Sequence, residues 1–215
     1  MSAATAARLS PRRPAARRVA RITRKTRETS ITMRVTLDGR GRTDVRTGIG
    51  FFDHMLSALA MHGGFDLSVA ATGDLHVDQH HLVEDCGIVL GQAVAKALGQ
   101  RRGIERSGFF AFPMEDALGL AAVDLAGRPS LTWRATFRRA RLGDLDADLL
   151  AEFFRGLTRG LAADLHVALP YRRNDHHAAE AIFKAVGKAL KLAVSRDGRY
   201  RTVIASTKGL LEVWR

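Results

Sequence analysis

The spacing of apolar and polar residues predicts strands and helices in a regular order through the first half of the chain. Residues 30–37 carry apolar side chains at every second position, which is typical of a strand. The Asp38-Gly39 pair that follows predicts a turn. The same reading predicts further strands over 45–49 and 65–71, and helices over 51–62 and 79–98.

The second half repeats this order, with strands predicted over 109–112, 118–125, 130–137 and 165–169, and helices over 146–161 and 174–194. Phe51-Phe52 is echoed by Phe153-Phe154, and His80-His81-x-x-Glu84 by His176-His177-x-x-Glu180, 96 positions later. We therefore expect an internal duplication within an α+β fold. Each half-repeat, 21–100 and 101–215, would place two helices on one face of a small mixed sheet, and the two halves would pack together.

Charge is unevenly distributed, and this changes the first impression of a nucleic-acid-binding protein. The net charge is +12, but residues 1–27 hold nine of the 34 basic residues and no acidic one. The remainder, with 25 basic and 22 acidic residues, is nearly neutral, so a nucleic-acid partner is not expected. Residues 1–20 are rich in Ala, Arg and Pro, and are predicted to be a disordered tail. A transit peptide is the alternative, but Pro11 and Pro14 disfavour its amphipathic helix.

The cellular setting is suggested by two simple features. Cys86 is the single cysteine, which fits a reducing compartment and a cytoplasmic location, and its apolar surroundings predict a small buried side chain. No apolar run approaches the length that crosses a bilayer, so no membrane association is expected.

The two His-His-x-x-Glu motifs carry the candidate chemistry. Neighbouring residues on a helix diverge by about 100°, so one pair does not readily send both imidazoles to one ion. Residues three or four positions apart share a face, so each glutamate stands beside one histidine of its motif. Each motif is therefore expected to serve two metal sites. Imidazole and carboxylate without thiolate suit manganese, iron, zinc or nickel. The alternative, that these are surface or capping histidines, is disfavoured by the repetition.

Two further histidines would complete a pair of sites. His54 lies in a predicted apolar helix, where a polar residue needs a reason, and His166 lies in a predicted strand. With them the chain offers six histidines and two glutamates, enough for two sites of four ligands each. His76 lies in a polar loop and is expected to be exposed, and His62 precedes two glycines, where a helix cap is the simpler reading.

With these residues in place, the chain resembles the imidazoleglycerol-phosphate dehydratases of histidine biosynthesis. One matching block reads Gly-Ile-Gly-Phe-Phe-Asp-His-Met-Leu, and another reads Asn-Asp-His-His-Ala-Ala-Glu-Ala-Ile-Phe-Lys. The blocks lie at 48–56, 62–67, 78–85, 113–118, 124–129, 174–184 and 206–209. Any single block is weak, but together, in the family's order over about residues 20–212, they are specific.

The resemblance implies a carbon-oxygen lyase that removes water from imidazole glycerol phosphate to give imidazole acetol phosphate, with two manganese ions per site. One ion would take His80, His166, His176 and Glu180, and the other His54, His81, Glu84 and His177. Two ions on the ring nitrogens would favour an imidazolate, which can expel the hydroxyl through a diazafulvene-like intermediate. Glu28 matches a glutamate near the substrate and would shuttle protons; the alternative is an exposed charge at the start of a strand.

The resemblance also supplies expectations about the substrate phosphate, the assembly and departures from the family. Candidates for binding the phosphate are His62, Arg106, Arg128, Lys184, Ser206 and Lys208, although each cation alone could be a solvated surface charge. Family members form a homo-oligomeric shell of 24 subunits with sites at subunit contacts. The chain departs from the family's pattern at Ala58, Ser107 and Arg172, and in the order Glu115-Asp116.

Two other functions remain open from sequence alone. A different dinuclear enzyme, such as a metal hydrolase, would use the same ligands to hold a nucleophilic water. A nucleic-acid-binding protein would use the basic N-terminal segment, but the nearly neutral remainder and the few aromatic residues argue against it.

Overall fold

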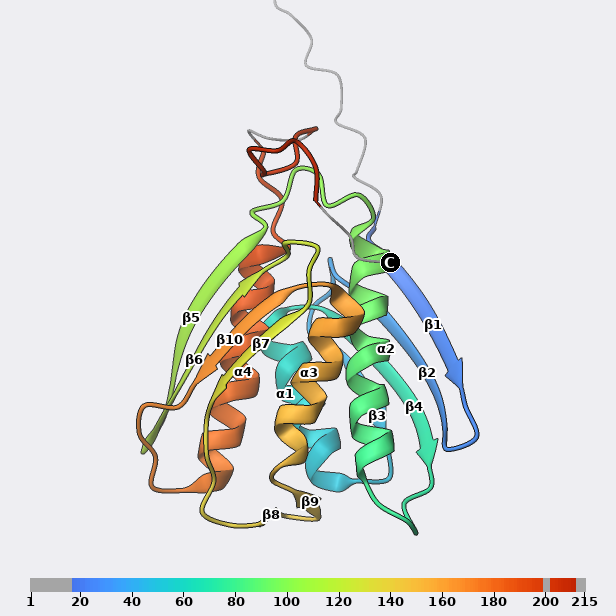
Figure 1. Cartoon of the computed structure of the whole chain (residues 1–215), viewed down its shortest axis with the longest axis vertical. Coiled ribbons are helices and arrows are strands. Elements are labelled where there is room, and N and C mark those ends of the chain that lie inside the picture. Colours follow the sequence, from blue (N-terminus) through green and yellow to red (C-terminus); the bar gives the residue numbers. More distant parts are fainter. Residues whose placement is uncertain (1–16, 199–201, 212–215) are drawn as a thin grey trace, which may run out of the picture.

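Two four-stranded sheets enclose four helices in the computed structural model, which describes residues 17–198 and 202–211 (Figure 1). The first sheet has the order β1 (Val19–Lys25), β2 (Thr29–Thr36), β4 (Asp66–Gly73), β3 (Thr43–Arg46). The second has the order β5 (Ser107–Met114), β6 (Ala117–Asp124), β10 (Asp164–Ala168), β7 (Ser130–Arg134), and β8 (Arg141–Leu142) pairs with β9 (Leu145–Asp146) in a small hairpin. The helices are α1 (Gly50–Gly63), α2 (His80–Leu98), α3 (Leu149–Leu161) and α4 (Asp175–Ala193).

The two sheets have the same topology, which confirms the duplicated α+β unit. In each sheet the first three strands in order are antiparallel, and the last pair, β4 with β3 or β10 with β7, is parallel. Helices α1 and α2 cover the first sheet, α3 and α4 cover the second, and α2 packs on α3 while α1 packs on α4. The division of the chain at residue 100 stays a prediction.

Most predicted elements are present, with differences at their ends. The helix predicted from residue 146 begins at Leu149, because Leu145 and Asp146 pair with the preceding strand as β9. The strand predicted over 45–49 is instead Thr43–Arg46, and the one predicted over 130–137 ends at Arg134.

The tail predicted over residues 1–20 overlaps the first strand of the structure. Residues 1–16 lie outside the described residues, but Val19 and Ala20 belong to β1, a strand that sequence reasoning missed. Strand β1 lies at the sheet edge, and its basic and polar residues alternate with only a few apolar ones. Its backbone is paired along its whole length with β2, and its alternate residues Ala20 and Ile22 pack into or against the core.

Helices α2 and α3 approach closely because glycines line both surfaces. Gly87 and Gly91 of α2 lie against backbone atoms of α3, and Gly156 and Gly160 of α3 lie against backbone atoms of α2. A Cβ at any of the four would collide with a carbonyl oxygen of the other helix. The core between the helices is aromatic, with Phe52, Phe153, Phe154 and Phe183 fully buried, and Cys86 is buried as expected.

All four helices begin at the lower end of the molecule in Figure 1. The first turns of α2 and α4 carry the two histidine motifs, so both motifs lie at this end of the molecule. The two helices cover different sheets, and α1 and α3 lie between them. Asp144 of the β8–β9 hairpin also acts at this end, because it accepts hydrogen bonds from the backbone N–H groups of Gly50 (2.7 Å) and Phe51 (2.8 Å) at the start of α1.

Candidate metal centre

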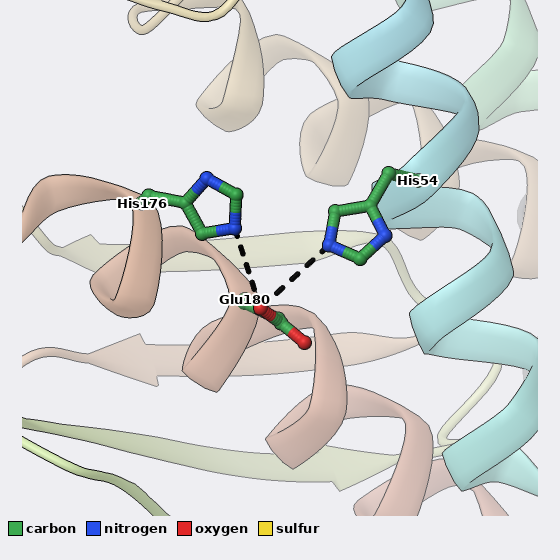
Figure 2. A group of neighbouring side chains, drawn as sticks. All are labelled: His54, His176 and Glu180. Carbon is green, nitrogen blue, oxygen red and sulfur yellow. Dashed lines mark ion pairs between the residues drawn. The ribbon is translucent and has the colours of Figure 1, made fainter.

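Helices α1 and α4 bring together His54, His176 and Glu180 (Figure 2). Nε2 of His54 lies 3.6 Å from Oε2 of Glu180, and Nε2 of His176 lies 3.5 Å from the same oxygen. All three ligand atoms lie within 4.8 Å of one another, and among the described residues this is the one such group of three or more His, Cys, Asp or Glu side chains. Both rings are about half exposed, so the group opens to solvent.

Glu180 is held in a fixed orientation by the next turn of its helix. Nζ of Lys184 lies 2.8 Å from Oε1 of Glu180, which leaves Oε2 facing the two imidazoles. Burial of Glu180 acts to raise its pKa, but the hydrogen bond from Lys184 and the nearby positive charges outweigh it, so the pKa lies below its usual value. The carboxylate is therefore ionised and available to a cation.

The motif on α2 follows the same plan. Nε2 of His80 lies 3.8 Å from Oε2 of Glu84, and Nη1 of Arg159 on α3 lies 2.7 Å from Oε1 of Glu84. In both motifs, therefore, the first histidine faces one oxygen of the glutamate, and a basic side chain, Lys184 or Arg159, pairs with the other oxygen. Sequence reasoning missed Arg159, because no local pattern links it to a motif 75 residues earlier.

The second histidine of each motif turns to a different carboxylate. Nδ1 of His81 lies 3.1 Å from Oδ2 of Asp74, and Nδ1 of His177 lies 3.1 Å from Oδ1 of Asp116. The hydrogen bond to Asp74 raises the pKa of His81 above its usual value. Oε1 of Glu28 lies 3.9 Å from Nε2 of His81, which places this predicted proton shuttle beside the motif.

His166 lies apart from both motifs. It lies on the face of the second sheet that points away from the helices, beside Phe109 and Ala122, and its Nε2 is 3.5 Å from Oδ1 of Asp164. The structure therefore does not bring His166 to His176 within one chain. It also places His54 beside His176 and Glu180, although the resemblance implies that His54 binds one ion and the other two bind the second. The assignment of ligands to each ion therefore stays a prediction.

Four of the predicted phosphate-binding residues line one cavity of about 700 Å³: Arg106, Arg128, Ser206 and Lys208. Arg106 is anchored there by Asp124, with N···O distances of 2.7 and 2.8 Å. This cavity lies with residues 202–211 at the upper end of Figure 1, opposite the first turns of the helices. The phosphate candidates and the histidine motifs of one chain are thus at opposite ends of the molecule.

The other two phosphate candidates lie elsewhere. Lys184 is the partner of Glu180, and its Nζ lies 5.3 Å from the ring centroid of Phe112. His62 packs against the same ring at 5.0 Å, and burial together with the charges of Lys184 and Lys188 lowers the pKa of His62. A phosphate-binding role for His62 and Lys184 stays a prediction.

Two of the departures from the family's pattern have a structural account. Nε of Arg172 lies 3.0 Å from Oδ1 of Asp175, a buried carboxylate that also accepts hydrogen bonds from the backbone N–H groups of Arg138 and Arg139. Arg172 thus fixes the loop in front of the second motif. The reversed Glu115-Asp116 order leaves both carboxylates beside His177. Nothing in the structure explains Ala58 or Ser107.

The comparison with protein families agrees with these motifs. Residues 47–190 match the family model described as imidazoleglycerol-phosphate dehydratase. The chain belongs to this family. Membership of this family makes it a hydro-lyase, and the family assignment made from the sequence is confirmed.

Individual relatives support the same conclusion. The chain is 54% identical over 194 residues to an imidazoleglycerol-phosphate dehydratase from Gluconobacter oxydans, covering 90% of this chain and 98% of that protein. It is 55% identical over 194 residues to one from Acidiphilium cryptum, covering 90% and 99%. A crystal structure from Pyrococcus furiosus superimposes with a TM-score of 0.77 at 37% identity, covering 88% of this chain and 100% of that one.

A second crystal structure, from Staphylococcus aureus, gives a TM-score of 0.75 at 32% identity, covering 83% of this chain and 99% of that one. The two crystal structures cover 88% and 83% of this chain, so they confirm the α+β fold. Among the described residues, no helix is both long enough and apolar enough to span a membrane.

Proposed function

We propose that the chain removes water from imidazole glycerol phosphate to give imidazole acetol phosphate, a step of histidine biosynthesis, at a site that binds two manganese ions. The observation that carries the proposal is the family match over 47–190, which includes both histidine motifs. The proposal includes a cytoplasmic location, which the single, buried cysteine supports.

The side chains at the lower end of the molecule fit a first-row divalent cation. His54, His176 and Glu180 present two imidazole nitrogens and one carboxylate oxygen, a donor set without thiolate that suits manganese. Ligand atoms lie about 2.0–2.2 Å from such a metal, so adjacent ligands stand roughly 3 Å apart. The observed separations of 3.6 Å from His54 and 3.5 Å from His176 to the Glu180 oxygen are near that value.

The full ligand list comprises both motifs and the two further histidines: His54, His80, His81, Glu84, His166, His176, His177 and Glu180. When bound, two manganese ions supply positive charge that favours the deprotonated form of an imidazole ring. Glu28 is half exposed and 3.9 Å from His81, so its carboxylate can move a proton at the reacting carbon. Arg106, Arg128, Ser206 and Lys208 offer guanidinium, hydroxyl and ammonium donors for the phosphate.

In this proposal the complete site is shared between copies of the chain, and the number of copies, 24, is taken from the family resemblance. The phosphate cavity and the histidine motifs of one chain lie at opposite ends, and His166 faces away from both motifs. Beside His166 the outer face of the second sheet carries Ala122 and Phe109, and Phe109 is 59% exposed. Such a patch is typical of a surface that another subunit covers. If a neighbouring chain packs there with its histidine motifs, His166 could bind a metal ion held by that chain.

The experiment that tests this function is a dehydratase assay with imidazole glycerol phosphate on metal-free protein, before and after manganese is added. We expect product only with manganese. His81→Ala and Glu180→Ala should abolish product formation and weaken assembly, since each removes a ligand. Product formation at the wild-type rate in either variant would refute the ligand list, and absence of product from manganese-loaded wild type would favour a metal hydrolase.

Mixing the two inactive variants tests whether the sites are shared. If the α2 motif of one chain and the α4 motif of a neighbour form one site, random co-assembly of His81→Ala and Glu180→Ala chains leaves about a quarter of the sites with both motifs intact. Co-expressed variants should therefore recover roughly that fraction of activity. A mixture that co-assembles to the size of wild type and is still as inactive as each variant alone would show that each site is built within one chain.

A further inference from the structure

The second histidine of each motif has an acidic partner on its Nδ1. Asp74 lies 3.1 Å from Nδ1 of His81, and Asp116 lies 3.1 Å from Nδ1 of His177. Both imidazoles and both carboxylates are partly buried, with side-chain exposures between 17% and 37%. In contrast, His80 and His176 use Nε2 to face the glutamate of their own motif.

The two acidic partners come from different places in the duplicated unit. Asp74 directly follows β4, whereas Asp116 lies in the turn between β5 and β6. The two residues that follow β10, Leu169 and Pro170, carry no carboxylate. The two halves thus reach the same His–Asp pairing through unrelated positions, so the pairing is not simply a remnant of the duplication.

The chemistry of the pair fixes which imidazole nitrogen is available. An ionised carboxylate only accepts hydrogen bonds, so Nδ1 of each histidine carries the proton and donates. The lone pair is then on Nε2, the nitrogen that can bind a metal. Nε2 of His81 indeed lies toward Glu28, on the other side of the ring from Asp74.

We propose that Asp74 and Asp116 are positioning residues that hold His81 and His177 with Nε2 free for the metal. This inference rests on the proposed function, because it concerns the same ligands. Oε2 of Glu115 lies 3.8 Å from Nδ1 of His177, so both carboxylates of this turn lie near the same nitrogen, with Asp116 the closer at 3.1 Å.

Manganese binding to the full-length, metal-free protein tests the proposal, measured as loss of the electron paramagnetic resonance signal of free Mn²⁺. Asp74→Ala should weaken manganese binding by roughly 10- to 100-fold, the usual effect of removing such a partner. Asp74→Asn keeps an oxygen acceptor and should bind within a few-fold of wild type. The double variant Asp116→Ala, Glu115→Gln should bind manganese more weakly than Asp116→Ala alone, because both carboxylates near His177 are then gone. Asp44→Ala, on β3 and paired with Arg46, is the control.

The melting temperature of the metal-free variants separates positioning from a structural role. We expect Asp74→Ala to melt within a few degrees of wild type while its manganese affinity falls. Affinity equal to wild type in Asp74→Ala and in the double variant would overturn the proposal, as would Asp74→Asn binding as weakly as Asp74→Ala. If wild type itself binds no manganese, the metal site of the proposed function is wrong. This outcome is distinguishable from failure of the positioning proposal, in which wild type binds manganese and the variants bind it equally well.

Discussion

The contact between α2 and α3 gives a prediction that links the fold to the candidate site. Gly156 of α3 faces the backbone of α2 at the turn that carries Glu84, and a Cβ there would collide with the Glu84 carbonyl oxygen and lie 3.0 Å from the Ile88 nitrogen. Neither atom is at the end of a flexible side chain. Gly156→Ala must therefore push the two helices apart or strain them.

Two effects of opposite sign determine the magnitude. Alanine in place of glycine in a helix interior favours folding by about 1 kcal/mol. Overpacking a tight contact costs about 1–3 kcal/mol or more, and rigid backbone obstacles favour the upper end of that range. We expect a net loss of about 1–2 kcal/mol, or a fall in melting temperature of about 2–8 °C for a chain of this size.

Thermal unfolding of metal-free protein, followed by circular dichroism, measures this effect. Gly198→Ala is the matched control, because a Cβ at Gly198 meets no atom within 4 Å. It should melt at the wild-type temperature or slightly above it, since alanine restricts the unfolded chain. A Gly156→Ala protein as stable as wild type, or more stable, would refute the close packing of α2 on α3.

Two further predictions concern the start of α1 and the N-terminal segment. Asp144→Ala removes the acceptor for the N–H groups of Gly50 and Phe51 and should lower stability by about 0.5–2 kcal/mol in chemical denaturation at pH 7. Burial acts to raise the pKa of Asp144, but the two hydrogen bonds outweigh this effect and bring the pKa below 3.8. The stabilisation by Asp144 is therefore complete well above pH 3.8 and is lost as the pH falls through the lowered pKa. A deficit that persists unchanged in acid would contradict this. Deleting residues 1–16, which ends before β1, should leave dehydratase activity intact, whereas loss of a nucleic-acid gel shift on deletion would support the rival function.

Much of the fold was predictable because its signals are local. The alternation in β2 puts Ile31, Met33 and Val35 on one face, and all three are fully buried. The repeated motif and the Phe-Phe pairs predicted the duplication, because they fall in equivalent helices. The Phe-Phe pairs lie in α1 and α3, and the motifs lie at the starts of α2 and α4. The edge strand β1 escaped detection, since only Ala20 and Ile22 of its residues pack in or against the core and the rest are mostly basic or polar.

The surroundings of the histidines could not be predicted in the same way. Helical spacing indicates that His80 and His81 point in different directions, but it does not indicate what each meets. Asp74 and Arg159 reach the α2 motif from separate elements, and only the tertiary fold brings them together. The position of His166 on an outer sheet face likewise follows from strand pairing rather than from the motif.

The central claim is that imidazoles and carboxylates from both halves of the duplicated unit converge on two cations. An anomalous-difference map at the manganese absorption edge, from crystals of the assembled protein grown with manganese, tests it most directly. We predict two peaks per chain, each contacted by one histidine of the α2 motif and one of an α4 motif, with neighbouring subunits included. A map without peaks beside His80, His81, His176 and His177 would contradict the account.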